Sequence, residues 1–236
     1  MVYNAPMKRK KILVVIPAFN EENMITHVLK TIPYSIEKNL LKILVIDDGS
    51  TDKTKALVKK QNILVLSHLF NRGLGGALGT GFAYARLHQY DALVTFDADG
   101  QHNADDISRL INPILKKQAD ITIGSRMLDA RGMPVFRRII NTFSNILTFL
   151  LFNIWTSDSQ SGLRAFSKQA IQKIQISTQG MEVSSEIFRE IKRNKFQMHE
   201  IPIKAVYTDY SLYKGQKLTN AVPVFLKLML HQFRFF

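Results

Sequence analysis

The sequence predicts an α/β fold with a mostly parallel central sheet and helices on both of its faces, and two observations lead to it. Short apolar runs rich in β-branched residues alternate with amphipathic stretches through the first half of the chain. The runs are apolar at nearly every position, which is typical of strands covered on both faces. Regular alternation of strand and helix favours a doubly wound sheet with right-handed crossovers. The expected strands are residues 13–16, 43–46, 63–66, 93–96 and 121–123.

Apolar residues spaced three and four positions apart predict the helices between these strands. Ser50, Thr51 and Asp52 follow a strand and a glycine, and Asp52 is interpreted as a helix cap. The expected helices are residues 25–32, 52–57 and 107–114, and the second half adds a helix over 182–193 and a strand over 200–206.

Composition limits the class of protein and the kind of partner. The 236 residues are 46% hydrophobic and 22% charged, without an internal repeat or a linker rich in Pro, Gly or Ser, so we expect a single domain over residues 1–236. The absence of cysteine excludes thiol catalysis, disulfide scaffolds and zinc sites built from cysteine. The formal net charge of +13 favours an anionic partner, such as a nucleotide, a nucleic acid or a phospholipid surface.

Two segments of the second half suggest contact with a membrane. Residues 139–157 carry no charge and are nearly long enough to cross a bilayer. Scattered polar residues and the adjacent Arg137 and Arg138 favour a helix around Ile139–Trp155 that lies in the membrane interface or in the core, over one that spans. The apolar and basic residues of 222–236 fit a helix on an anionic membrane surface or one docked on the core.

The glycine-rich stretch 71–81 excludes two kinds of phosphate site. Its spacing does not match G-x-G-x-x-G, since Leu78 and Tyr84 stand where glycine is needed, and the chain has no P-loop motif. The glycines are expected to let a helix approach the sheet or a ligand closely.

Carboxylates follow three predicted strands at their C-terminal ends, where open α/β sheets bind ligands. Glu21 follows the first strand, Asp47 and Asp48 follow the second, and Asp97 and Asp99 follow the fourth. Asp97 and Asp99 are two residues apart, so they point the same way in an extended chain. Paired carboxylates facing a cleft suit Mg²⁺ or Mn²⁺ when substrate phosphates supply other ligands. The sequence therefore predicts a divalent metal site at Asp97 and Asp99.

Seven motifs in order make the chain resemble glycosyltransferase family 2, with its GT-A nucleotide-sugar-binding fold, over roughly residues 10–220. The later motifs are similar to the branch of dolichol-phosphate and polyprenyl-phosphate mannose synthases. The resemblance implies a nucleotide-sugar-binding half, residues 10–130, and a half that faces acceptor and membrane, residues 131–236. The motifs are Val15–Glu22, Val45–Asp52, Asn71–Gly75, Phe96–His102, Gly124–Arg126, Asp158–Phe166 and Glu200–Ile203.

The resemblance implies roles for the matching positions. Asp48 would hydrogen-bond the base, Ile46 would add a main-chain contact, and Phe19 keeps the stacking face of the more common Tyr without its hydroxyl. The metal would be held by Asp97, Asp99 and Gln101. The implied nucleotide-sugar site is completed by Pro17, Glu21, Ala98, Arg126, Arg138 and Lys214, and the implied acceptor residues are Ser161 and Arg164.

The implied catalytic residues are Asp99, Arg126 and Asp158. A sugar hydroxyl needs a general base, whereas a lipid phosphate is already anionic and needs only cations to position it. Asp158 is therefore either a base or, as we favour, a residue that orients Arg164 or the acceptor. Lys214 would lie on a loop that closes over the donor, and Lys217 is a rival for that role.

Several residues also have purely structural interpretations. Asp47 is expected to cap the following turn. His102 is either a metal ligand or a surface histidine, and Arg137 and Arg138 contact either the diphosphate or the membrane surface. The acidic residues spaced four apart, Glu182, Glu186 and Glu190, are expected on one solvated helix face.

The implied function is metal-dependent, inverting transfer of a hexose from GDP-mannose or a UDP-sugar to polyprenyl or dolichyl phosphate. We expect peripheral binding at the cytoplasmic face of the membrane and no nucleic-acid partner, with a membrane protein or a second copy as a possible partner. Transfer to a glycan hydroxyl is the alternative enzyme function, although Arg164 lacks the following Trp of processive synthases. A non-catalytic module that binds membranes or nucleic acid would leave the acids at three strand ends unexplained.

Overall fold

The computed structural model describes residues 9–204 and 206, and among them eight strands form one mixed sheet. The order is β2-β3-β1-β5-β7-β6-β8, and β4 lies beside the end of β3. All pairings are parallel except those made by β2 and β7, so the expected mostly parallel sheet is confirmed. The strands are β1 (Lys11–Ala18), β2 (Ser35–Ile36), β3 (Asn39–Asp47), β4 (Leu64–Ser67), β5 (Ala92–Thr95), β6 (Ile121–Ser125), β7 (Arg164–Ser167) and β8 (Met198–Pro202).

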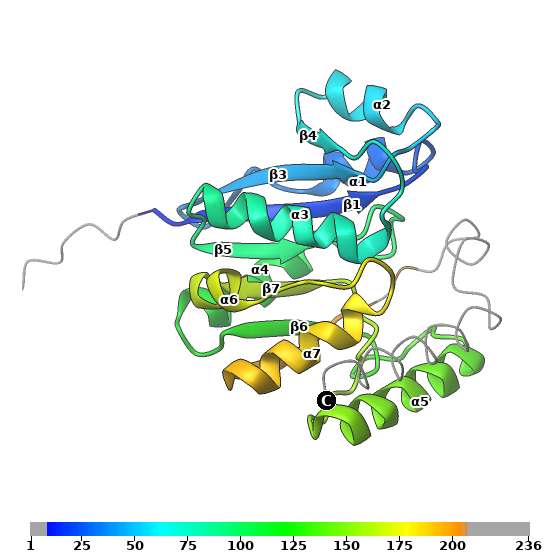
Figure 1. Cartoon of the computed structure of the whole chain (residues 1–236), viewed down its shortest axis with the longest axis vertical. Helices are drawn as coiled ribbons and strands as arrows, with labels where there is room; N and C mark the ends of the chain where they lie inside the picture. The colour runs from blue at the N-terminus through cyan, green and yellow to red at the C-terminus, as the bar shows by residue number, and fades with distance from the viewer. Residues whose placement is uncertain (1–8, 205, 207–236) are drawn as a thin grey trace, which may run out of the picture.

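Helices cover both faces of the sheet, as the continuous apolar runs predict. Along β1, Ile12, Val14 and Ile16 pack into one core, and Leu13 and Val15 pack into the other. Helices α1, α2 and α4 contribute to the first core, whereas α3, α6 and α7 contribute to the second (Figure 1). The helices are α1 (Ile25–Thr31), α2 (Thr54–Lys60), α3 (Gly73–Leu87), α4 (Asp106–Leu115), α5 (Val135–Phe152), α6 (Lys168–Lys173) and α7 (Val183–Asn194).

The glycine-rich stretch forms the N-terminal part of α3, and its glycines allow the close approach that the sequence predicts. A Cβ atom on Gly81 would collide with the side chain of Val15 in β1, and one on Gly75 would collide with the carbonyl oxygen of Thr178. The helix therefore lies tightly between the sheet and the loop that precedes α7.

The five strands expected in the first half are present, but β7 was not predicted from the sequence. It begins with Arg164, lacks a β-branched run, and lies antiparallel between β5 and β6. The last expected strand is β8, which ends at Pro202, short of residue 206. The C-terminal pattern of residues 222–236 lies outside the described residues.

The uncharged segment forms most of α5, which lies at the lower right of Figure 1, away from the strands. The helix begins at Val135, before the uncharged run, and ends where Asn153 takes a left-handed conformation (φ 52°). Its buried side chains are Asn145, Thr148 and Phe152. The interpretation as a core helix is therefore wrong. In the described part of the chain, α5 is the one helix long and apolar enough to cross a membrane. Some helices of soluble proteins are equally long and apolar.

Candidate functional site

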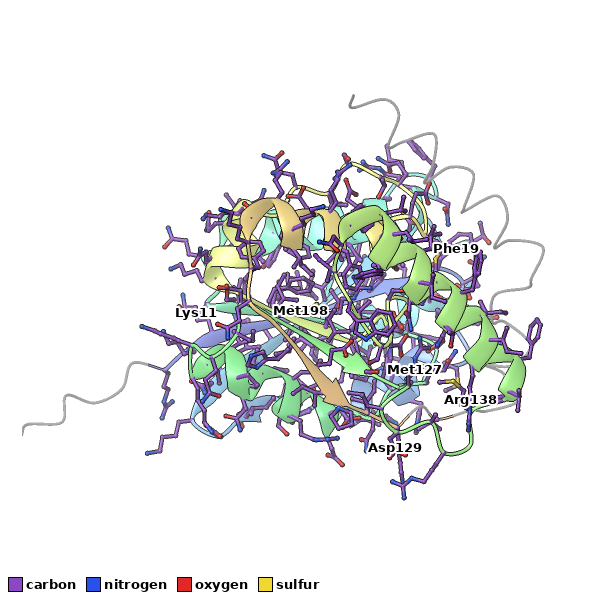
Figure 2. The ribbon with its side chains drawn as sticks, turned by 90° about the horizontal axis from the view of Figure 1, so that it is seen from below. Lys11, Phe19, Met127, Asp129, Arg138 and Met198 are labelled. Carbon is purple, nitrogen blue, oxygen red and sulfur yellow. The ribbon has the colours of Figure 1, made fainter. Side chains whose placement is uncertain are left out.

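The carboxyl ends of β1, β3 and β5 open onto one cavity of about 470 Å³. Ala18 at the end of β1 pairs with Asp47 at the end of β3, and β5 pairs with β1 on its other side, so the loops that follow start side by side. In Figure 2, Lys11, at the start of β1, lies on the opposite side of the molecule from Phe19, which follows the end of that strand. Predicted site residues on the cavity wall are Pro17, Phe19, Glu21, Asp48, Asp97, Ala98, Asp99, Gln101 and Arg126.

Asp97 follows β5 and is fixed by His102 and by the backbone beneath it. Its Oδ2 lies 2.9 Å from His102 Nε2, and a Cβ atom on Gly162 would collide with its carboxylate oxygens. Burial raises the pKa of Asp97, but the hydrogen bond from His102 and the charges of His102, Arg126 and Arg164 together hold this pKa below its ordinary value. His102 is buried beside Asp97, so the interpretation as a surface histidine is wrong.

Asp99 completes the acidic pair. Gln101 donates to it twice, from Nε2 to Oδ2 at 2.7 Å and from the backbone N–H to Oδ1 at 3.0 Å. Burial and the negative charge of Asp97 raise the pKa of Asp99 above its ordinary value. The two carboxylates thus repel each other on the wall of one cavity.

A divalent cation fits this wall because it would neutralise the repulsion between Asp97 and Asp99. Carboxylate and amide oxygens, the latter available from Gln101, are ligands that Mg²⁺ and Mn²⁺ accept. Within residues 9–204 and 206, no group of three Asp, Glu, His or Cys residues is placed to hold an ion unaided. An ion at this wall would therefore take its remaining ligands from water or from a substrate, which suits a diphosphate.

The part of the cavity near β1 and β3 holds the residues expected to bind a nucleotide. Phe19 is 40% exposed and presents an aromatic face, while Glu21 is buried on the wall. Asp48 is also on the wall and accepts hydrogen bonds from the backbone N–H groups of Arg72 (3.0 Å) and Gly73 (2.7 Å), at the start of α3. Ile46 is fully buried, and its side chain faces the core.

Arg126 enters the cavity from the end of β6, and Asp158 holds it there. The Asp158 carboxylate accepts hydrogen bonds from Arg126 Nε (2.7 Å), Nη2 (2.8 Å) and the backbone N–H (3.0 Å). Asp158 is fully buried and is not part of the cavity wall. It is therefore placed to orient Arg126, and its charge also acts on the buried Arg164. Its burial does not fit a base that faces a substrate.

Comparison with known proteins shows the family of the chain. Residues 13–175 match the family described as Glycosyl transferase family 2, about two thirds of the chain. The chain belongs to glycosyltransferase family 2. It is 42% identical over 231 residues to an uncharacterized protein of Methanocaldococcus jannaschii, covering 96% of this chain and 94% of that protein. It is 36% identical over 246 residues to the UDP-N-acetylglucosamine–dolichyl-phosphate N-acetylglucosaminyltransferase of Methanococcus voltae, covering 95% and 97%.

A solved structure similar to this glycosyltransferase is glucosyl-3-phosphoglycerate synthase of Mycobacterium tuberculosis in complex with Mn²⁺, UDP-glucose and phosphoglyceric acid. The TM-score is 0.73 at 18% identity, covering 93% of this chain and 77% of that one. At this identity the likeness concerns the fold, and it confirms the GT-A fold that the motifs imply.

Two residues expected to bind the acceptor of this glycosyltransferase lie behind the cavity wall. Arg164 is buried and donates to the carbonyl oxygens of Ser161 (2.9 Å) and Ser159 (2.8 Å), with its guanidinium 5.4 Å from the ring centre of Phe188. Burial lowers the pKa of Arg164 to about 10. Ser161 is 1% exposed, and its neighbours Gln160 and Gly162 line the cavity instead. Arg164 and Ser161 therefore lie behind the wall and do not line the cavity.

The arginine of α5 that faces the cavity is Arg137. The sequence left open whether this residue contacts the diphosphate or the membrane surface. Arg137 lines the cavity together with Ile140 and Asn141, three and four residues along the helix. Arg138, the residue implied by the resemblance, is exposed at the N-terminal end of α5 (Figure 2) and donates to the carbonyl oxygen of Ala130 (2.5 Å). Lys214 and its rival Lys217 lie outside the described residues.

Helix α7 of the enzyme contradicts the expectation of a solvated acidic face. Glu186 and Glu190 are buried. Glu186 accepts hydrogen bonds from the backbone and hydroxyl groups of Ser177 and Thr178, and so holds the loop that packs on the start of α3. The sequence showed the spacing of these residues but not their partners. Asp47, by contrast, caps its turn as expected, since it accepts the backbone N–H of Ser50 at 3.1 Å.

Proposed function

We propose that this glycosyltransferase moves a sugar from a UDP-linked donor to a polyprenyl phosphate such as dolichyl phosphate, with inversion at the anomeric carbon and with Mg²⁺ or Mn²⁺ bound. The proposal rests on one observation: the acidic pair, Arg126 and Arg137 line the same cavity. The Methanococcus voltae relative, which matches nearly the whole chain, is named for a UDP-sugar donor and a dolichyl-phosphate acceptor. The Mycobacterium tuberculosis structure contains Mn²⁺ and UDP-glucose.

Some charged residues of the wall are assigned to the donor and others to the acceptor. Asp97 and Asp99, with Gln101 beside them, would hold the cation, which would neutralise charge growing on the leaving diphosphate. Arg126, fixed by Asp158, adds a permanent positive charge that needs no reorganisation during the reaction. Arg137 reaches the cavity from α5 and is placed to bind the acceptor phosphate.

The carboxylates of the wall favour a phosphate acceptor over a sugar hydroxyl. Transfer to a hydroxyl calls for a general base. Asp158, which the sequence offered for that role, is buried behind Arg126. Asp97 and Asp99 are assigned to the cation, and Asp48 and Glu21 lie in the part of the cavity assigned to the nucleotide. An acceptor that is already anionic fits the side of the cavity lined by Arg126 and Arg137.

Helix α5 supports a location at the membrane surface, where a polyprenyl phosphate resides. Beyond the cavity-facing Arg137, it exposes Ile139 (63%), Phe143 (63%) and Leu150 (72%). Arg138, exposed at the N-terminal end of the same helix, supplies a positive charge. Apolar side chains flanked by cations are typical of helices that rest on anionic lipid. We propose that α5 lies in the interface at the cytoplasmic face, with the cavity open beside it.

The test is transfer of labelled sugar into the organic phase. The full chain is incubated with polyprenyl phosphate in vesicles and with labelled UDP-N-acetylglucosamine, UDP-glucose or GDP-mannose, with Mn²⁺ or with a chelator. Label is expected in the lipid fraction from a UDP-sugar only, and the chelator should abolish it. Label that enters only water-soluble glycans would contradict the acceptor, and label from GDP-mannose alone would contradict the donor.

Adjacent arginines provide a matched pair for the acceptor site. Arg137→Gln is expected to lower transfer by about tenfold or more, because it removes a charge-assisted hydrogen bond to the acceptor. The effect should appear as a higher KM for polyprenyl phosphate. Arg138→Gln removes the same charge from a side chain outside the cavity and should change transfer less than about threefold. Equal losses in the two variants would contradict the assignment of Arg137.

A further inference from the structure

Asp48 is held by three hydrogen bonds from its own chain. Its Oδ1 accepts from His68 Nδ1 at 2.6 Å and from the backbone N–H of Arg72 at 3.0 Å, and its Oδ2 accepts from the backbone N–H of Gly73 at 2.7 Å. A carboxylate offers about four acceptor positions, so about one remains, on Oδ2. Because Asp48 lines the cavity, a ligand there can use that position.

His68 is the side chain that fills the position on Oδ1, and the proposed reaction does not use it. It follows β4 directly, its backbone N–H donates to the carbonyl oxygen of Asp47 at 2.9 Å, and its side chain is 10% exposed. Its other ring nitrogen, Nε2, lies 2.8 Å from the hydroxyl of Thr80 on α3. A carboxylate only accepts hydrogen bonds, so Nδ1 carries a proton. The imidazole is thus fixed at both ends behind Asp48.

We infer that His68 is a positioning residue that sets the nucleotide specificity of the site: it leaves Asp48 able to accept one hydrogen bond from a base, which selects uracil over guanine. The inference rests on the proposed function and gives a structural cause for its preference for a UDP-linked donor. Uracil presents a single imide N–H. Guanine presents N1–H and N2–H side by side and needs two acceptors, and its second donor would stay unpaired here. An unpaired buried donor weakens binding more than a missing contact does.

The single acceptor position left on Asp48 also predicts how two further bases bind. Cytosine has an acceptor at N3, where uracil has its imide N–H. The ionised carboxylate of Asp48 has no proton to donate to that nitrogen. A methyl group on N3 of uracil removes the single donor while leaving the rest of the nucleotide unchanged. Both nucleotides should therefore bind less tightly than UDP.

The first test uses the unaltered full chain and equilibrium binding with Mn²⁺ present. UDP is expected to bind at least about tenfold more tightly than GDP, CDP or N3-methyl-UDP. GDP binding as tight as UDP binding would overturn the inference and leave the transferase function standing. If none of the four nucleotides binds, the proposed function fails as well.

Two substitutions at His68 separate positioning from mere stability. His68→Leu frees Oδ1 of Asp48, so the preference for UDP over GDP should narrow by about threefold or more. His68→Asn keeps an N–H near the place of Nδ1 and should retain the preference, as should His27→Gln on the exposed side of α1. An unchanged UDP-to-GDP ratio in His68→Leu would overturn the inference. Because the ratio is measured within one variant, a uniform loss of stability does not imitate the expected result.

Discussion

Helices α4 and α5 are both amphipathic, yet they differ in how much of their apolar face they bury. Helix α4 buries Ile107, Leu110 and Ile111 against the sheet. Helix α5 buries Asn145, Thr148 and, at its end, Phe152, and leaves most of its large apolar residues exposed. An apolar face is stable where it meets a non-aqueous neighbour. For α4 that neighbour is the chain's own core, whereas α5 presents its apolar face outward, as expected of a helix that meets lipid. Variants in the two halves separate the proposed donor-binding half from the half that α5 adds.

The largest expected effect concerns the donor half. Asp99→Asn removes one charge of the acidic pair and should lower sugar transfer by about 100- to 1,000-fold, because the leaving diphosphate loses its cation. Transfer is measured as label in the organic phase, and UDP binding in the presence of Mn²⁺ should weaken in parallel. Binding to anionic vesicles should stay unchanged, since α5 is untouched. A variant that lost vesicle binding as well would show that the two halves are not separable.

The next prediction compares how truncation of a buried residue of α4 and of an exposed residue of α5 affects stability. Leu110→Ala on α4 should lower the free energy of unfolding by about 2–5 kcal/mol, because Leu110 is fully buried. Phe143→Ala on α5 should lower it by less than about 0.5 kcal/mol, because the side chain is 63% exposed. Urea unfolding without lipid measures both. A large loss of stability in Phe143→Ala would mean that Phe143 packs against another part of the protein. The contrast between the two helices would then fail.

Helix α7 extends the comparison, because it buries the carboxylate of Glu186, which hydrogen bonds from the same chain satisfy. Burial raises the pKa of Glu186, but hydrogen bonds from Ser177 and Thr178 outweigh it and hold the pKa below the ordinary value of 4.5. A depressed pKa stabilises the fold at pH above the unfolded-state value, and this stability is lost as pH falls through the folded-state value. Glu186→Gln should destabilise by about 1–3 kcal/mol at pH 7 and by less below pH 4.5. Melting temperatures across pH measure this, and a deficit independent of pH would contradict it.

The smallest expected effect is at the membrane. Replacing Ile139 and Phe143 together by Glu should lower binding to anionic vesicles by about tenfold or more, because two apolar side chains can no longer enter the interface. UDP binding should not change. Leu87→Glu, at an exposed apolar residue near the end of α3, is the matched control and should bind vesicles normally. Co-sedimentation with vesicles decides between these outcomes, and equal losses in the control would contradict a specific role for α5.

Local patterns predicted most of the strands and the acidic pair. The runs that became β1 and β3 are apolar at nearly every position, which is a property of the sequence itself, and strand ends fix where Asp48 and Asp97 emerge. Partners distant in the sequence were not predicted. The pairing of Arg126 with Asp158 spans 32 residues, and that of Asp48 with His68 links the ends of β3 and β4. No local spacing encodes such contacts.

The sequence by itself determined the family, the α/β class and the residues that face one another at the sheet edge, because these follow from hydrophobic runs and ordered motifs. Only the tertiary structure decided that Arg137, and not Arg138, enters the cavity, since successive residues of a helix lie about 100° apart and the packing of α5 sets which one turns inward. It also decided that Glu186 is buried and that the apolar face of α5 is exposed. Burial depends on what packs against a residue, and that neighbour comes from elsewhere in the chain or from outside it.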